Sequence, residues 1–335
     1  MTAEQIYVGS YTSQPGGGEG IGFGTLDGIT VAAATADPSF LVRSADGRFL
    51  YATNEEDSGR VSAFAIRADG GLEFLNDQPT GGMHPCHLGI DPTGKYLLSA
   101  NYSSGSIAIH PIGADGSLGT ATQIVQREGT GPNEERQEGP HAHQVVFFGE
   151  YVFDVDLGSD TVYTSTLTAA GNLEAVDLLH IHPGAGPRHL AFHPGGGAAY
   201  VINELDSTLS VCSYAKGALQ VVQTLSTRPA DSPGESYPAE LLISADGRFL
   251  YGSNRGDDTI AVFAVASDGL SAELVQTIDS GGNWPRHLAF STDGSLLYAA
   301  NERSDTIATF TITDGLLEPA GDPTSWPKPV CVLPV

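Results

Sequence analysis

The chain has 335 residues, with 42 Gly and 20 Pro, and its 40 acidic and 15 basic residues give a formal net charge of −25 at pH 7. This charge repels phosphate backbones and anionic headgroups, so we expect neither a nucleic acid nor a membrane as a partner. Residues 1–5 lack the basic start and apolar core of a signal peptide, and no apolar run is long enough to span a bilayer. We therefore expect a cytoplasmic protein rich in short strands and turns.

A repeat of about 48 residues runs through the chain, and each unit is marked by a proline at the start of an apolar strand. In the clearest units, such as residues 85–88, 187–190 and 285–288, the pattern is Pro-x-His-Leu. A Gly-containing turn follows, then an apolar strand that ends in Asn, then an alternating strand. In chain order the marking prolines are Pro38, Pro85, Pro140, Pro187, Pro238, Pro285 and Pro329.

Seven such units, each with about four strands, predict an all-β, seven-bladed β-propeller that occupies residues 1–335 as one domain. The last unit contains only an innermost strand near residues 329–333, and the N-terminal strand near Ile6–Ser10 has the character of a second strand. Antiparallel pairing of these two strands would close the ring and protect both sheet edges.

Propeller topology gathers the polar residues of the repeat at one rim. An innermost strand starts on the face of the ring where the second strand ends, so the residues beside each marking proline meet those that follow each Asn. On a chain with so few basic residues, this concentration of Arg and His is what an anionic substrate requires. The rim residues are His87, Asn101, His141, His143, Arg188, His189, Asn203, Glu204, Glu240, Asn254, Arg255, Arg286, His287, Asn301, Glu302 and Arg303.

A repeated residue at a repeated position also has a structural explanation. The Asn residues can hold turns, and the repeated His residues can pack one blade against the next. Functional residues are therefore expected where the units differ, which favours His143, Arg188, Glu204 and Arg255 as the catalytic set. The residues assigned to substrate binding are His87, Asn101, His141, His189, Arg286 and His287.

Two polar insertions, residues 126–139 and 228–237, lengthen neighbouring units and enter the same rim. They are lids over the site or simply tolerated loop growth. The His pairs at 141/143 and 180/182 lack convincing third and fourth ligands, and the nearby Arg residues disfavour a cation, so we expect no metal and no cofactor. The three cysteines, Cys86, Cys212 and Cys331, are expected to be reduced and buried.

Residues 101–106, 139–144 and 187–192 together resemble the seven-bladed propeller lactonase family, which includes bacterial 6-phosphogluconolactonases and a fungal carboxymuconate cyclase. The resemblance covers the whole chain. It implies the opening of 6-phospho-D-glucono-1,5-lactone in the pentose phosphate pathway. It also implies that the family's His, Arg, Glu and Arg correspond to the His141/His143 motif, Arg188, Glu204 and Arg255.

Lactone hydrolysis needs an activated water, a stabilised oxyanion and a protonated leaving group. We expect Glu204 or His143 as the base, Arg188 at the oxyanion or the product carboxylate, and Arg255 or Arg286 at the phosphate. No GxSxG motif is present, which disfavours an acyl-enzyme. A muconate-type cycloisomerase and a non-catalytic binding propeller remain as alternatives. The expected partner is a small anionic lactone, bound by a monomer or a weak homo-oligomer.

Overall fold

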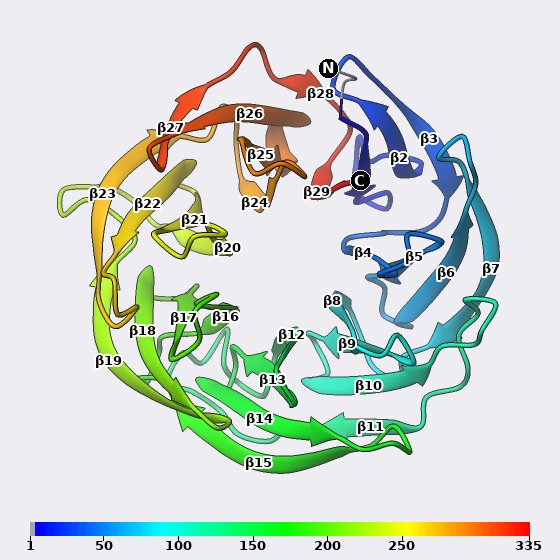
Figure 1. Cartoon of the computed structure of the whole chain (residues 1–335), viewed down its shortest axis with the longest axis horizontal. Coiled ribbons are helices and arrows are strands. Elements are labelled where there is room, and N and C mark those ends of the chain that lie inside the picture. Colours follow the sequence, from blue (N-terminus) through cyan, green and yellow to red (C-terminus); the bar gives the residue numbers. More distant parts are fainter. Residues whose placement is uncertain (1–3) are drawn as a thin grey trace.

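The computed structural model describes residues 4–335, which form seven antiparallel sheets arranged around one axis (Figure 1). Six of these sheets have four strands, and the sheet of β24 to β27 is joined by a short extra strand, β28. The predicted seven-bladed propeller is thus confirmed. Residues 1–3 of the predicted domain lie outside the described residues. None of the described residues forms a helix long and apolar enough to cross a membrane.

Each blade contributes an innermost strand, a second, a third and an outer strand. The innermost strands are β4 (Leu41–Arg43), β8 (Pro85–Ile90), β12 (Ala142–Phe148), β16 (Pro187–Phe192), β20 (Tyr237–Ile243), β24 (Pro285–Phe290) and β29 (Pro329–Pro334). The second strands are β1 (Ile6–Ser10), β5 (Phe49–Asn54), β9 (Tyr96–Asn101), β13 (Tyr151–Asp156), β17 (Ala198–Asn203), β21 (Phe249–Arg255) and β25 (Leu296–Asn301).

The third and outer strands complete the blades. The third strands are β2 (Gly20–Thr25), β6 (Arg60–Ile66), β10 (Ser106–Pro111), β14 (Thr161–Leu167), β18 (Thr208–Ala215), β22 (Thr259–Val265) and β26 (Thr306–Thr313). The outer strands are β3 (Gly28–Ala34), β7 (Leu72–Pro79), β11 (Gln123–Gln126), β15 (Leu173–His180), β19 (Ala218–Ser226), β23 (Ala272–Asp279) and β27 (Leu316–Pro319). The short strand β28 (Thr324–Ser325) pairs with β26, and a 3₁₀ turn spans Glu302–Ser304.

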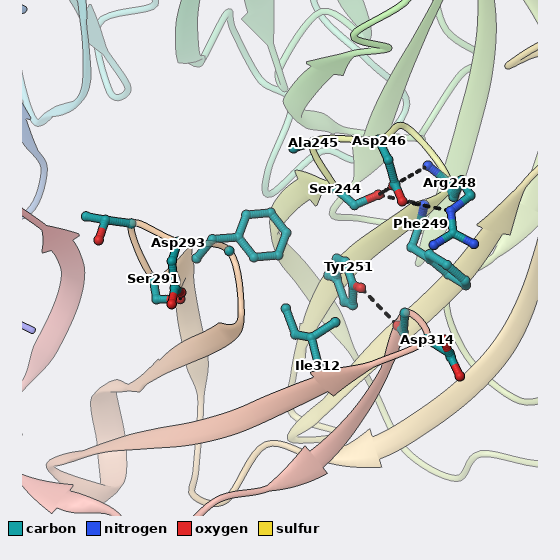
Figure 2. Close-up of a pocket in the computed structure, with 14 residues that line it drawn as sticks. Ser244, Ala245, Asp246, Arg248, Phe249, Tyr251, Ser291, Asp293, Ile312 and Asp314 are labelled. Atoms are coloured by element: carbon teal, nitrogen blue, oxygen red, sulfur yellow. Dashed lines mark hydrogen bonds and ion pairs between the residues drawn. The ribbon is translucent and has the colours of Figure 1, made fainter. Parts of the chain in front are cut away.

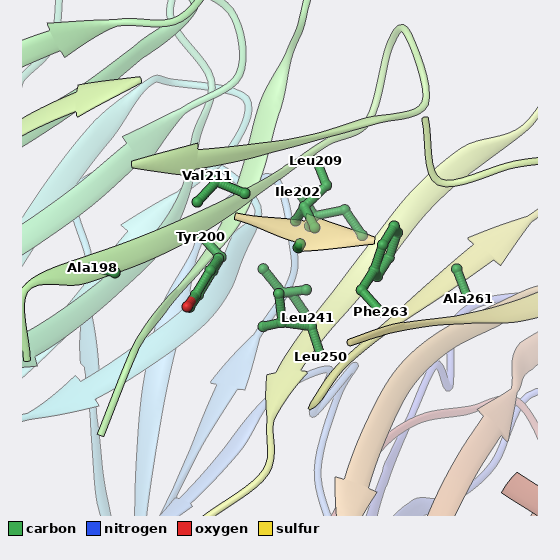
Figure 3. Close-up of a cluster of buried hydrophobic side chains, with 10 residues drawn as sticks. Ala198, Tyr200, Ile202, Leu209, Val211, Leu241, Leu250, Ala261 and Phe263 are labelled. Atoms are coloured by element: carbon green, nitrogen blue, oxygen red, sulfur yellow. The ribbon is translucent and has the colours of Figure 1, made fainter. Parts of the chain in front are cut away.

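The hydrophobic core lies between neighbouring blades. Tyr200 and Ile202 of β17 pack against Leu241, Leu250 and Phe263 of the next blade, and all five side chains are buried (Figure 3). Similar clusters fill the other inter-blade spaces. Each blade thus buries apolar side chains against its neighbours.

The ring is closed by its two ends. Strand β29 pairs antiparallel with β1, and Tyr7 lies opposite Leu333 while Val8 lies opposite Val332. In Figure 1 the red strand β29 accordingly lies beside the dark-blue start of the described chain. This arrangement confirms the predicted pairing, which covers the inner edge of β1 with the C-terminal strand.

The opposite face of the ring contains hollows that follow the repeat. One of about 540 Å³ lies between the Ser244–Phe249 turn and the next blade (Figure 2), and another of about 690 Å³ lies beside the equivalent Ser44–Phe49 turn. Both turns carry the sequence SADGRF, with Ser Oγ donating to Asp Oδ1. Two hollows at equivalent positions are a consequence of the repeated turn, so we do not regard them as sites.

The innermost strands share an irregularity near the rim. In β8, β12, β16 and β24 the register shifts by one residue, and the residue that bulges out is Cys86, His143, Arg188 or Arg286 respectively. In β12 it is Ala142, not Pro140, that takes the place of the marking proline, since Ala142 lies opposite Asp156 as Pro85 lies opposite Asn101. The expected alignment of this unit was therefore wrong by two residues, because Pro140 belongs to the preceding insertion.

The closing strand gives a first test of the fold. Val332 in β29 is buried, whereas Val222 in the outer strand β19 is about half exposed. We expect Val332→Asp to lower the melting temperature by about 10 °C or more, because it places a charge in the seam of the ring. Val222→Asp, the matched control, should change it by a few degrees at most. Equal effects in thermal unfolding would contradict the proposed role of the seam.

Candidate active site

Three guanidinium groups surround the carboxylate of Glu204 at the rim. Arg136 Nη2 donates to Oε1 at 2.6 Å, Arg255 Nη2 donates to Oε2 at 2.6 Å, and Arg188 Nε lies 3.2 Å from Oε2. Glu204 directly follows β17, Arg188 bulges from β16, and Arg255 ends β21. Two neighbouring blades and one insertion therefore bring four charged side chains to a single point.

The charges of this cluster are only partly balanced. Burial alone would raise the pKa of Glu204, but the nearby charges of Arg255, Arg188 and Arg136 outweigh it and hold the pKa at about 2. Burial, together with repulsion from Arg255 and Arg286, lowers the pKa of Arg188 to about 9. One carboxylate cannot neutralise three guanidinium groups, so the cluster favours the binding of a further anion.

Each of the three guanidinium groups is held in place and still has N–H groups to offer. Arg188 Nη1 donates to the carbonyl of Ala239 at 2.6 Å, and Arg255 Nε donates to that of Tyr237 at 2.9 Å. Arg136 Nη2 also donates to the hydroxyl of Tyr102 at 3.1 Å. Within residues 4–335, Arg188 Nη2, Arg255 Nη1 and Arg136 Nη1 donate to no protein acceptor. These are suitable donors for an oxyanion or a phosphate.

His143 lies beside this cluster as a buried, neutral imidazole. Its ring is in edge contact with Tyr102 and His189, at centroid distances of 5.6 and 5.3 Å. Its Nδ1 lies 3.9 Å from Cys86 Sγ. Burial, followed by the charge of Arg188, lowers the pKa of His143 well below 6.5. At neutral pH the ring is therefore unprotonated.

The two residues expected as the general base, His143 and Glu204, have different surroundings. A carboxylate with a pKa of about 2 has little affinity for a proton, and Arg136 and Arg255 occupy both of its oxygens. Glu204 therefore holds three guanidinium groups in place. Which of Glu204 and His143 acts as the base stays a prediction.

His141 lies on the wall of the same site. Its ring stacks on Tyr102 at a centroid distance of 4.6 Å, and its backbone N–H donates to Asp156 Oδ1. Tyr102 therefore links His141, His143 and Arg136. The sequence also placed Tyr102 at this rim, without assigning it a role in the site.

Two of the repeated histidines connect blades. His87 Nδ1 accepts from the N–H of Val145 at 3.5 Å, and His287 Nδ1 accepts from that of Val332 at 3.3 Å. Each bond joins one innermost strand to the next, as the structural alternative predicted. These contacts fit the alternative that His87 and His287 pack one blade against the next, and their assignment to substrate binding stays a prediction.

His189 has a different role because it lies next to the arginine cluster. Its Nδ1 is 2.8 Å from Glu240 Oε1, and its Nε2 is 3.4 Å from Arg188 Nη1. Glu240 is also 3.6 Å from His287 Nε2, and burial raises the pKa of its carboxyl. His189 therefore contacts Arg188 and is itself held by Glu240.

Two other predicted binding residues lie outside the cluster. Asn101 is fully buried, and its amide donates to Ser106 Oγ within the blade, which fits the structural alternative, while its assignment to substrate binding stays a prediction. Arg286 is 3.7 Å from Glu55 and lies over the ring of Tyr11. Burial disfavours its charge, but Tyr11, Glu55 and Glu302 together raise its pKa. Arg286 is therefore already compensated by its own partners.

Sequence reasoning missed Arg136. This residue lies in the insertion between β11 and β12, whereas the second insertion provides the carbonyl of Tyr237 that binds Arg255. Both insertions thus reach the site, as expected. The available signal was an arginine within an acidic insertion that ends at the His143 strand.

The two histidine pairs, 141/143 and 180/182, are the residues that the sequence offered as metal ligands. Residues 4–335 contain no group of three or more His, Cys, Asp or Glu side chains able to hold a metal ion. His180 contacts Thr161 Oγ1, and His182 contacts Asp206. The three cysteines are free and buried, as predicted.

Comparison with known proteins identifies the family. Residues 5–334 match the family described as Lactonase, 7-bladed beta-propeller. The chain belongs to the seven-bladed β-propeller lactonase family. The resemblance seen in its sequence is thereby confirmed.

Several known proteins are similar to this chain over most of its length. A 6-phosphogluconolactonase of Bacillus subtilis is 37% identical over 296 residues, which is 84% of each chain. The structure of a periplasmic gluconolactonase of Pseudomonas aeruginosa superposes with a TM-score of 0.91 at 31% identity, covering 99% of each chain. A protein from Lactobacillus plantarum superposes with a TM-score of 0.93 at 34% identity and the same coverage.

The position of Glu204 predicts a pH-dependent contribution to stability. Its pKa is about 2 in the folded lactonase against 4.5 ordinarily, so its stabilisation is complete above about pH 4.5 and is lost as the pH falls towards 2. We expect Glu204→Gln to cost about 3 kcal/mol at pH 7 and progressively less below pH 4.5. Urea unfolding across this range measures the difference.

The exposed carboxylate Glu150 provides the control, since Glu150→Gln should have little effect at any pH. A difference between wild type and Glu204→Gln that stays constant from pH 7 to pH 2.5 would contradict the charge-pairing role.

Proposed function

We propose that this protein hydrolyses 6-phospho-D-glucono-1,5-lactone to 6-phosphogluconate, a step of the pentose phosphate pathway. The observation that carries the proposal is a set of three guanidinium groups with free N–H donors beside a neutral, buried imidazole. Membership of the lactonase family and the names of the relatives support it. Phosphorylated sugars are made and retained inside cells, so we also propose a cytoplasmic location.

Substrate binding depends on the charge of the cluster. The substrate carries a phosphate and its product also carries a carboxylate, so both are anions. The remainder of the protein surface is strongly acidic, and only a local excess of guanidinium groups attracts such a ligand. Arg188 and Arg255 provide that excess deep in the site, where their side chains are 3% and 6% exposed.

Attack on the lactone begins with a proton transfer to His143. The neutral imidazole takes a proton from a water molecule as its oxygen bonds to C1 of the lactone. The carbonyl oxygen becomes an oxyanion, which accepts hydrogen bonds from the free N–H groups of Arg188. Because Arg188 disfavours a charged His143, the developing oxyanion offsets the cost of forming the imidazolium.

Ring opening returns the proton. The tetrahedral intermediate collapses, the bond between C1 and the ring oxygen breaks, and the imidazolium of His143 gives its proton to that oxygen. The products are a hydroxyl group and a carboxylic acid, which ionises at neutral pH. The product carboxylate then faces Arg188, the residue expected at this position from the sequence.

Substitution of His143 tests the assigned chemistry. We expect His143→Asn to lower kcat by about 10²-fold or more, because the proton acceptor is lost. His193→Asn, which changes a histidine on the opposite face of the ring, should retain wild-type turnover. The measurement is lactone hydrolysis corrected for the spontaneous reaction, with and without the 6-phosphate.

Different outcomes separate the alternatives. Wild-type turnover in His143→Asn would remove His143 as the base. If the wild-type protein opens neither lactone but acts on a muconate-type lactone, the cycloisomerase alternative replaces the proposed function.

A metal-free reaction is a separate prediction. Exhaustive chelation should leave lactone hydrolysis unchanged, because guanidinium groups provide the electrophilic assistance that a metal otherwise supplies. Loss of turnover on chelation, followed by recovery with one divalent ion, would instead make His141 and His143 candidate ligands.

A further inference from the structure

We propose that Arg136 is the residue that binds the phosphate group of the substrate and thereby sets the preference for phosphorylated lactones. This inference rests on the proposed function and deepens it. It replaces the expectation that Arg255 or Arg286 binds the phosphate.

The insertion that carries Arg136 is held firmly against the ring. Gln137 is 1% exposed, and its Nε2 donates to the carbonyl of Leu157 at 2.9 Å and to Asp160 Oδ1 at 2.8 Å. The N–H of Gln137 also donates to the carbonyl of Asn133 at 2.7 Å. These buried bonds fix the position of the neighbouring Arg136, so its guanidinium group is placed before the substrate arrives.

Arg136 lies at the opening of the cluster. Its side chain is 35% exposed, whereas those of Arg188 and Arg255 are almost completely buried. All three contact Glu204, so the cluster runs from two buried guanidinium groups to the partly exposed one of Arg136, and we call this exposed side the mouth of the site. A ligand that enters with its carbonyl towards Arg188 extends outward past Arg136.

The spacing between Arg136 and Arg188 fits the substrate. Arg136 and Arg188 contact different oxygens of the same carboxylate, so the contacting nitrogens are at most ~8 Å apart. In the lactone, four atoms separate the carbonyl carbon from phosphorus, namely the ring oxygen, C5, C6 and the ester oxygen. One substrate can therefore reach both guanidinium groups at once.

Arg136 also has the donors that a phosphate needs. Its Nη2 serves Glu204 and Tyr102, while Nε and Nη1 donate to no acceptor within residues 4–335. The hydroxyl of Tyr102 accepts from Arg136, which leaves its own hydrogen free to donate. An arginine with a neighbouring hydroxyl donor suits the oxygens of a phosphate.

The other arginines are less suitable for this role. Arg255 already donates to Tyr237, Pro238 and Glu204 and is buried. Arg286 is compensated by Glu55 and Tyr11. Neither provides an exposed, partly unused guanidinium group at the mouth of the site.

The test compares two substrates that differ only in the phosphate. For Arg136→Ala we expect the ratio of kcat/KM for 6-phosphogluconolactone to that for glucono-1,5-lactone to fall at least tenfold, mainly through KM. Arg136→Lys, which keeps the charge but not the paired donors, should recover part of the ratio. Arg48→Ala removes an exposed arginine on the opposite face and should leave the ratio unchanged.

Titration with inorganic phosphate gives a readout that needs no turnover. Calorimetry should show at least tenfold weaker phosphate binding to Arg136→Ala than to Arg48→Ala. Equal losses on both lactones, or an unchanged ratio, would overturn the proposal, since Arg136 would then act only through Glu204 or not at all. If the wild-type protein opens neither lactone, the proposed function fails, and the phosphate titration alone decides whether Arg136 binds the anion.

Discussion

The contact of one buried carboxylate with three guanidinium groups organises this end of the propeller. Arginines brought together in a poorly hydrated place repel one another, and the pKa of Arg188 is lowered first by its burial and then by that repulsion. Glu204 counters one of the three charges and fixes all three positions. The remaining positive charge stands out against a surface of net charge −25, so it provides both attraction for an anion and a prepared set of donors.

The propeller makes this cluster possible because every blade provides the same rim positions, while the residue at each position differs from blade to blade. The bulge near the start of the innermost strand holds Cys86, His143, Arg188 or Arg286 in different blades. The position after the second strand is occupied by different side chains in the same way. Packing between blades is carried by other positions, such as the buried tyrosines and the linking histidines. The rim can thus vary in charge while the ring remains intact.

Much of the fold was predictable from the sequence because the repeat, the turn residues and the alternating strands are local features. The same regularity identified Arg188, Glu204 and Arg255 as departures from a pattern. The repeat pattern placed the start of the His143 strand two residues too early, because an insertion directly precedes this strand. Arg136 could not be found in this way, because its contact with Glu204 spans 68 residues from a loop without periodicity. The sequence also could not show whether the Glu204 carboxylate is free to accept a proton or is paired with arginines. That depends on Arg136, Arg188 and Arg255, which come from three separate segments.

In the proposed reaction the guanidinium cluster orients an anionic sugar acid with its carboxyl end inward. A crystal structure of the protein with 6-phosphogluconate, the product of that reaction, would show this orientation. We expect the product carboxylate within hydrogen-bonding distance of Arg188, close to His143, and the phosphate bound by Arg136 at the mouth of the site. A product bound in the reverse orientation, or in the hollow beside Ser244–Phe249 on the opposite face, would mean that the cluster does not orient the substrate in this way.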